Sequence, residues 1–463
     1  MTFEKVIGIF LFRRDLRLFD NLGLINLSTK VNCIIPIFIF DNYQIDINKK
    51  NKYYRSNHAI QFICESIIDL NTQLNNKLCI FKGDVLEILT SVIVKLSETN
   101  KKIILGVNSD YTKYAQWRDK KIMQLCDNMN VEFLSTENDI TLLPFHKMLK
   151  RDNTAYIVFN AFYNNSLNHV VNKPINNKFN RYIKIDSNFN IYSLNMLYEY
   201  NKFLAQKGGR SIGISIMRNK NIVYNPDKIC EKSYQISAYL NFGCISIREF
   251  YYGSKASKQQ LYWRDFYTCI LKYTPLANNF EKLIDERYEK IKWENNRVLW
   301  KLLIQSKTGF LIIDAAMREL IKTGYIGNRL RLLLSHFWIK YLFIHPLHPI
   351  YGSQVGYSKY LVDCIVSQNK LNHQWLLELD RYRFASKLVG RPFRIDNKLI
   401  KKYDLDCIYI KRWIPEFQNV PNNDIYNWDT EMFKKYKIHV APIFNWEERF
   451  IKWKKLCNDA VAT

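Results

Sequence analysis

The chain has 463 residues, which is long enough to bury more than one hydrophobic core and favours two or more domains. Apolar residues make up 48% and aromatic residues 15% of the chain, a composition that excludes a disordered tail. The net charge of +25 favours a polyanionic partner, nucleic acid before a membrane surface, although a bias toward Lys, Asn, Ile and Tyr is an alternative source of the excess.

The ten cysteines are scattered and none forms a CxxC pair, so we expect a reducing, intracellular compartment and no metal site. The N-terminal apolar run is too short for a signal peptide and continues into charged residues. The longest apolar stretch, 332–344, contains His336 and Lys340 and is too short to cross a bilayer. We therefore expect no membrane association.

The first third of the chain alternates between two patterns. Runs that are apolar on both faces predict buried strands, and segments with the helical period separate them. The expected strands are 5–12, 32–41, 77–83, 101–110 and 131–135, and the expected helices are 57–74, 84–96 and 111–128. This alternation predicts an α/β domain with a parallel sheet and right-handed crossovers. No glycine-rich phosphate loop of the GxGxxG or GxxxxGK[ST] type follows any of these strands.

The rest of the chain divides into two parts. Residues 136–210 are rich in Asn, Lys and Tyr and are interpreted as an irregular connector. From 211 onward the strand pattern disappears, and apolar residues recur at helical spacing, with several segments ending at glycine. We expect an α/β domain over 1–135, the connector over 136–210 and an all-helical domain over 211–463.

An unusual polar set lies within the helical part. Asp363 sits in an apolar run and needs a partner if it is buried, which Arg331 or Arg329 could supply. The two arginines, spaced by two, do not share a helix face. The alternative interpretation is a structural ion pair beside two core tryptophans.

The order of several short motifs adds to this interpretation. "FLFRRDLRLFDN" (10–21) resembles the opening signature of the photolyase/cryptochrome family. Later blocks resemble that family in the same order: "NSDYTKYAQWRD", "ISAYLNFGCIS", "LYWRDFY", "KTGFLIIDAAMREL", "TGYIGNRLR" and "YIKRWIPEF". The resemblance runs from about residue 5 to about residue 450 and is nearest to the class I DNA photolyases. It implies an α/β antenna-type domain followed by a helical domain that binds FAD and DNA.

The resemblance also implies a reaction. Reduced FAD, excited by blue light, gives one electron to a cyclobutane pyrimidine dimer that is flipped out of UV-damaged DNA, and the dimer splits. Such a protein is expected to work as a monomer wherever the DNA is. A second chromophore, a folate or a deazaflavin, would bind the α/β domain near 108–119, although an empty pocket is equally expected there.

Individual positions match functional residues of the family. Asn369 matches the asparagine beside the flavin N5 atom, and Trp293 matches the outermost tryptophan of the chain that carries electrons to the flavin. The positions implied at the flavin are Ser233 and Ser237 (phosphates), Gln260, Arg264, Asn328, Arg331, Asp363 and Asn369. The positions implied at the lesion or the DNA are Trp263, Asn328, Arg329, Trp375 and Arg394, with Arg264 as a further phosphate contact.

Two positions bear on the lesion. Gln260 resembles the enzymes that repair (6-4) products, but those enzymes need a histidine pair on the "GNRLR" helix as proton donors. Here the two positions are Asn328 and Leu332. This favours the cyclobutane dimer.

The segment 361–378 departs from the family pattern. Ile365 replaces an acid near the flavin, His373 replaces the tryptophan nearest to it, and 344–352 offers no tryptophan for the middle of the electron chain. Leu376 to Glu378 are bulky where small residues are usual, and the longer stretch to Tyr382 would narrow the cavity. The alternatives to a repair enzyme are therefore a photolyase-like DNA-binding protein without repair activity and a cryptochrome-type blue-light receptor.

Overall fold

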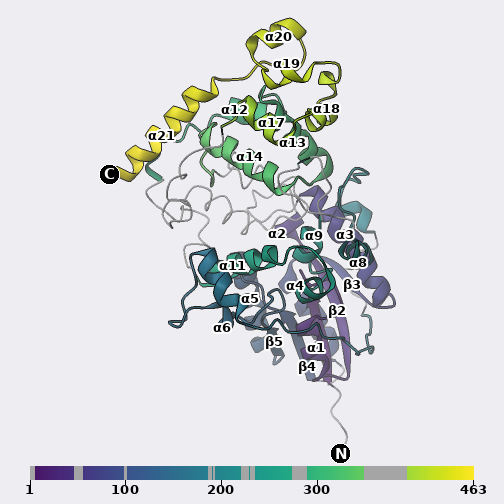
Figure 1. The fold of residues 1–463 in the computed structure, drawn as a ribbon. Coiled ribbons are helices and arrows are strands. Elements are labelled where there is room, and N and C mark those ends of the chain that lie inside the picture. Colours follow the sequence, from purple (N-terminus) through teal and green to yellow (C-terminus); the bar gives the residue numbers. More distant parts are fainter. Residues whose placement is uncertain are drawn as a thin grey trace, which may run out of the picture.

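Five strands form one parallel sheet (Figure 1). They are β1 (Val6–Phe12), β2 (Cys33–Asp41), β3 (Cys79–Gly83), β4 (Lys102–Asn108) and β5 (Glu132–Thr136), in the order β3-β2-β1-β4-β5. The structure is a computed structural model that describes residues 6–45, 56–98, 102–185, 190, 193–219, 229, 235–273, 289–348 and 394–462. The predicted strands and their parallel pairing are confirmed.

The strand order reverses between β1 and β4. Ile9 in β1 pairs with Ile35 in β2 on one side and with Leu105 in β4 on the other. On one side of β1 the chain adds β2 and then β3, and on the other side it adds β4 and then β5. In open parallel sheets, the loops at the carboxyl ends of two such strands diverge and leave a crevice where ligands bind. Here those loops begin at Arg13 and Ser109.

Helices cover both faces of the sheet. α1 (Leu22–Ser28) and α3 (Asn57–Gln73) pack on one face, and α4 (Val85–Ser97) and α5 (Lys113–Asn128) pack on the other. The short α2 (Asn42–Ile45) follows β2. Each of the four packing helices begins at a side chain that accepts a bond from a backbone N–H of its first turn, as good N-caps do. These caps are Asn21, Ser56, Asp84 and Thr112.

Two strand glycines make room for α1, which the sequence did not predict. A Cβ atom added to Gly8 would lie 3.1 Å from the Leu27 side chain, and one added to Gly106 would lie 3.0 Å from it. Larger residues at these positions would push α1 away from the sheet. α1 has only seven residues, too few for the helical period to stand out from the surrounding loop.

The predicted connector is mostly irregular, with short regular pieces. These are α6 (Phe145–Met148), α7 (Phe159–Leu167) and the 3-10 helix η1 (Leu194–Leu197). Tyr182 forms a single bridge with Ile34 in β2, so the connector runs back along the sheet.

The described part of the chain from residue 210 onward is helical, as predicted. Its first helices are α8 (Arg210–Arg218), α9 (Ser237–Asn241), α10 (Ile247–Gly253) and α11 (Gln259–Tyr273). The later elements are α12 (Arg297–Ile304), α13 (Leu311–Thr323), α14 (Asn328–Lys340), α17 (Asn397–Tyr403), α18 (Ile408–Trp413), η4 (Pro415–Phe417), α19 (Asn422–Tyr426), α20 (Thr430–Tyr436) and α21 (Trp446–Ala462). The predicted fold class, an α/β sheet domain followed by a helical region, is confirmed.

The described helices after residue 210 belong to separate hydrophobic cores, two large ones and a small one that Trp453 and Cys457 of α21 form with Ile339 of α14. The core on one face of the sheet continues through α9, α10 and α11, whereas α13, α14 and the helices after them enclose a second core. Figure 1 shows α9 and α11 at the end of the sheet group that lies toward α14.

The two groups are joined at the C-terminal end of α13. His58 of α3 bonds to the Ile321 carbonyl at 3.0 Å, and the Asn201 side chain donates to the Lys322 carbonyl at 2.8 Å. The backbone N–H of Ala205 donates to the Thr323 carbonyl at 2.9 Å. Three consecutive carbonyl groups at a helix end are thereby satisfied by the sheet group and the connector.

None of the helices in the described ranges is long and apolar enough to cross a membrane. The eight cysteines among the described residues are all free thiols, and seven of them are buried.

Candidate functional site

The predicted flavin phosphate site lies at the start of α9. Ser237 is the first residue of this helix, and Ile236 at the N-cap position makes no capping bond. Beside it, the Gln206 side chain donates to the Gln235 carbonyl, and its buried Oε1 has no partner among the described residues. Uncapped N–H groups and a hydroxyl at a helix start fit an anion such as the flavin diphosphate. Ser233 lies outside the described residues.

Trp263 and Gln260 are one turn apart on α11. The Gln260 side chain is exposed. The Trp263 ring stacks on Phe159 of α7 with centroids 3.5 Å apart and an interplanar angle of 7°, and it also lies against Tyr267 at 5.8 Å. In this arrangement Trp263 stacks on protein rings. The predicted stacking of Trp263 on a flipped base stays a prediction.

Arg264 and Asp265 tie α11 to the connector. The Arg264 guanidinium donates to the Ile140 carbonyl and, at 3.4 Å, to the Leu240 carbonyl, and burial lowers its pKa to about 10. These bonds give Arg264 a structural role beside its predicted contact with the flavin or a phosphate. Asp265 accepts from the Leu142 N–H at 2.8 Å, and burial raises its pKa to about 7. The sequence marks Asp265 as unusual beside Trp263 and Arg264 in a helix core, but it gives this residue no role.

The start of α14 carries three predicted residues that point to different neighbours. Asn328 is exposed at the first position of the helix. The Arg329 guanidinium lies over the Tyr403 ring at 5.4 Å, whereas Arg331 donates from Nε to the Ile326 carbonyl at 2.9 Å. The two arginines therefore face different sides, as their spacing predicts. The acid expected to pair with Arg331 lies outside the described residues.

The segment that opens the family signature forms a buried charge cluster. Arg17 bonds to Asp139 at 2.7 Å, and Arg248 of α10 bonds to Asp20 at 2.9 Å. All four side chains are at most 5% exposed. Arg17 also donates to the Gly243 carbonyl at 3.2 Å, so the cluster connects the loop after β1 with the helical part. In the sequence, this motif served only to recognise the family, and it did not predict that its charged residues join the sheet domain to the helical part.

Trp293, the predicted outer end of the electron chain, contacts a second tryptophan. Its ring centroid is 5.8 Å from that of Trp453 in α21, and Trp453 is buried and stacks on Phe343 at 6.1 Å. His345 lies 5.2 Å from Trp293 on its other side. Trp453 was missed because it is far from Trp293 in the sequence and belongs to a helix that carries no family motif quoted above.

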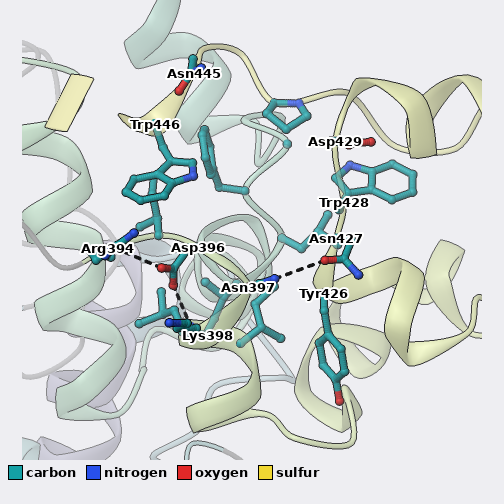
Figure 2. A pocket seen from close by; sticks show the side chains of 18 of the residues that line it. Arg394, Asp396, Asn397, Lys398, Tyr426, Asn427, Trp428, Asp429, Asn445 and Trp446 are labelled. Carbon is teal, nitrogen blue, oxygen red and sulfur yellow. Dashed lines mark hydrogen bonds and ion pairs between the residues drawn. The ribbon is translucent and has the colours of Figure 1, made fainter. Parts of the chain in front are cut away.

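Arg394 lies at the edge of a cavity of about 830 Å³ (Figure 2). Its side chain is 60% exposed, bonds to Asp396 at 3.2 Å and lies over the Trp446 ring at 5.1 Å. Lys398, Lys401 and Lys402 follow on α17, and Lys402 also lies over Tyr403, the ring that Arg329 covers. Arg329 of α14 and Lys402 of α17 therefore lie close together, over the same ring.

The carboxyl edge of the sheet carries an aromatic group at the switch point. Tyr43, Tyr114 and Trp117 lie within 6.3 Å of one another by ring centroids, and Tyr43 and Trp117 are more than 40% exposed. Arg13 bonds to Asp119 and Arg14 bonds to Asp110 beside them. Stacking surface and guanidinium groups meet where ligands of such sheets bind.

The remaining predicted positions, Asp363, Asn369 and Trp375, lie outside the described residues, as do the substituted Ile365 and His373 and the segment 376–382. Within the described ranges, no group of three or more His, Cys, Asp or Glu side chains is arranged to hold a metal ion.

These features define a class of protein in which a five-stranded parallel sheet domain is joined to a helical region. A family model described as "DNA photolyase" matches residues 8–177, and one described as "FAD binding domain of DNA photolyase" matches residues 257–462. The chain belongs to the photolyase/cryptochrome family, and its cofactor is FAD.

Similar proteins agree with this assignment along the whole chain. The structure of a photolyase from Sulfolobus tokodaii, which holds two FAD molecules, is 31% identical with a TM-score of 0.84 and covers 98% of this chain and 100% of its own. A deoxyribodipyrimidine photo-lyase of Buchnera aphidicola (subspecies Baizongia pistaciae) is 27% identical over 95% of both chains. Cryptochrome-1 of Drosophila melanogaster is 25% identical over 90% of this chain and 80% of its own.

Proposed function

We propose that the protein is a light-driven DNA photolyase that splits cyclobutane pyrimidine dimers. The observation that carries the proposal is the full-length similarity to a photolyase at 31% identity. The choice of lesion rests on α14, which has Asn328 and Leu332 where (6-4) enzymes need a histidine pair. Without those proton donors, a mechanism that begins with electron transfer alone is favoured.

The chain's own residues would bind and orient the flavin. Ser237 and the uncapped start of α9 would hold the diphosphate, with Ser233 beside them. Arg331 would face the isoalloxazine with Asp363, and Asn369 would accept a bond at N5 and favour the reduced form. Bound FAD, reduced and excited by blue light, would supply one electron to the dimer.

The DNA would lie across α14 and α17. Arg329, Arg394 and the three lysines of α17 offer cations for phosphate groups, and Asn328 is exposed at the start of α14. A damaged base pair costs less to open than an intact one, so the same face would select the lesion by ease of flipping. Trp375, and Trp263 if its contact with Phe159 opens, would stack on the flipped dimer.

A second chromophore would bind at the carboxyl edge of the sheet. The Tyr43, Tyr114 and Trp117 rings and the nearby Arg13 and Arg14 support this placement, because a planar anionic chromophore needs both stacking and charge. The photolyase from Sulfolobus tokodaii holds two FAD molecules, which adds a flavin to the folate and deazaflavin that the sequence suggests.

The test is repair by the purified protein after reconstitution with FAD and chemical reduction. Under blue light it should reverse cyclobutane dimers in a duplex and leave (6-4) products intact, and it should do nothing in the dark. Flavin binding and DNA binding without repair would support the non-repairing homologue, and light-dependent flavin chemistry without DNA binding would support a cryptochrome. A chain that cannot retain FAD would refute all three.

A further inference from the structure

The cavity beside Arg394 is built where four helices begin. Its walls come from 309–312 at the start of α13, 394–400 at the start of α17, 425–430 between the end of α19 and the start of α20, and 442–447 at the start of α21. Its volume of about 830 Å³ falls within the range of about 300–1,000 Å³ that is typical of small-molecule sites. None of these residues is among the positions that the family resemblance places at the flavin.

Two tryptophans form opposite sides of the cavity. Figure 2 shows Trp446 with Arg394 on one side and Trp428 with Asn427 on the other. Trp428 is held in place, because its Nε1 donates to the Val440 carbonyl at 2.9 Å and its ring packs against Phe417. Trp428 is only 8% exposed and belongs to the second core, so Trp446, which is partly exposed, is the ring whose face a planar ligand can reach.

Carboxamide groups line the space between the tryptophans. Asn397 donates to Asn427 at 3.2 Å, and Figure 2 shows this pair between the two aromatic sides. Asn445 lies beside Trp446 at the start of α21. A carboxamide carries both donors and an acceptor, and so does the edge of a nucleobase.

The charges that line the cavity nearly cancel. The cations are Arg394 and Lys398, and the anions are Asp396, Asp429 and Glu447. Two of the carboxylates are already engaged: Asp396 bonds to Arg394 at 3.2 Å, and Asp429 caps α20 through the Met432 N–H at 2.8 Å. A balanced lining disfavours a strongly charged ligand and favours a neutral heteroaromatic ring.

We propose that this cavity binds a nucleobase, stacked against Trp446 and bonded at its edge to Asn397 or Asn445. The base can come from a free nucleoside or from a nucleic-acid strand that passes over Arg394. The proposal is independent of the flavin and of repair activity.

The experiment measures adenosine and thymidine binding to the FAD-loaded protein by calorimetry and by ligand-observed NMR. The variants are Trp446→Ala, Asn397→Leu and Tyr200→Ala, the last one removing an exposed ring of the connector that belongs to no proposed site. We expect binding to weaken at least about tenfold in Trp446→Ala, since stacking on an aromatic side chain contributes that much per base. Asn397→Leu should also weaken binding while keeping the fold, and Tyr200→Ala should bind as the parent does.

A second arm separates the two sources of the base. Single-stranded oligonucleotides with and without one abasic position are compared on the parent and on Trp446→Ala. If the strand is the source, Trp446→Ala removes the preference for the intact oligonucleotide. Nucleoside binding that survives both cavity substitutions, or that disappears in Tyr200→Ala, would overturn the proposal. So would the lack of binding of either nucleoside together with an unchanged oligonucleotide preference.

Discussion

Replacing Asp265 by asparagine should make the protein more stable in mildly alkaline solution. Asp265 is fully buried in α11, and burial raises its pKa from 3.8 to about 7. Only one of its oxygens has a hydrogen-bond partner within the described ranges, the Leu142 N–H. The protonated form is therefore favoured in the folded state.

The sign and size of the effect follow from linkage. Because the folded-state pKa is raised, the group contributes stability that is fully present below about pH 4 and is lost as the pH rises through about 7. A difference of roughly three pKa units corresponds to about 4 kcal/mol, at about 1.4 kcal/mol per unit. Asparagine does not titrate, so Asp265→Asn removes this loss.

The asparagine also has a cost. Its amide group would replace an oxygen without a described partner, and a buried donor without an acceptor costs about 1–3 kcal/mol. Asp265→Asn should accordingly be less stable than the parent at pH 5 and more stable at pH 8. Chemical denaturation of both proteins across pH 5–8 measures the change.

Asp314→Asn is the matched control. Asp314 is equally buried, but its carboxylate accepts from Thr308, from the Gly309 N–H and from His439. Its substitution should destabilise the protein across the whole pH range. The reasoning fails if the Asp265→Asn curve stays parallel to that of the parent between pH 5 and pH 8.

Three further results are expected. Arg248→Met should destabilise the fold by about 3–5 kcal/mol, because it leaves Asp20 buried without its charge partner. Arg318→Met breaks a half-exposed ion pair and should cost no more than about 1 kcal/mol, and thermal unfolding of both variants measures the difference. The slope of log binding constant against log salt concentration should become shallower by about one phosphate contact in Arg329→Ala and in Lys401→Ala. Lys434→Ala on α20 is the control and should leave the slope unchanged. Equal slopes in all three variants would contradict the proposed DNA face. Trp453→Phe should slow the blue-light reduction of bound oxidised FAD several-fold, because Trp453 is the buried ring that touches Trp293. Trp413→Phe is the control and should leave the rate unchanged. An unchanged rate in Trp453→Phe would show that Trp453 is not on the electron route.

The sheet could be predicted because its strands are buried on both faces and its helices begin at strong caps. Both signals are local in sequence, so periodicity and single residues such as Asp84 or Thr112 reveal them. α1 escaped because its packing depends on Gly8 and Gly106, which lie on different strands. Nothing in the segment 22–28 itself records that contact.

The site was predicted only where a motif identifies a residue type. Ser237, Arg329 and Arg331 were found in this way, but their neighbours were not. Arg264 turned out to bond to the Ile140 carbonyl, and Trp293 to touch Trp453, each across more than 100 positions of the chain. Contacts of that range depend on the assembled fold, which spacing within a motif does not encode.

The buried cluster of Arg17, Asp20, Asp139 and Arg248 has a consequence for how the chain matures on the ribosome. A nascent chain released only as far as β5 has all its strands. Asp20 still lacks its cation, however, and the part of the core that α10 and α11 complete is still exposed. The sheet therefore cannot reach its final stability until α11 has emerged. Fragments that end before residue 273 should depend on chaperones or aggregate. The two halves of the chain, expressed separately, should each be less stable than they are in the whole protein.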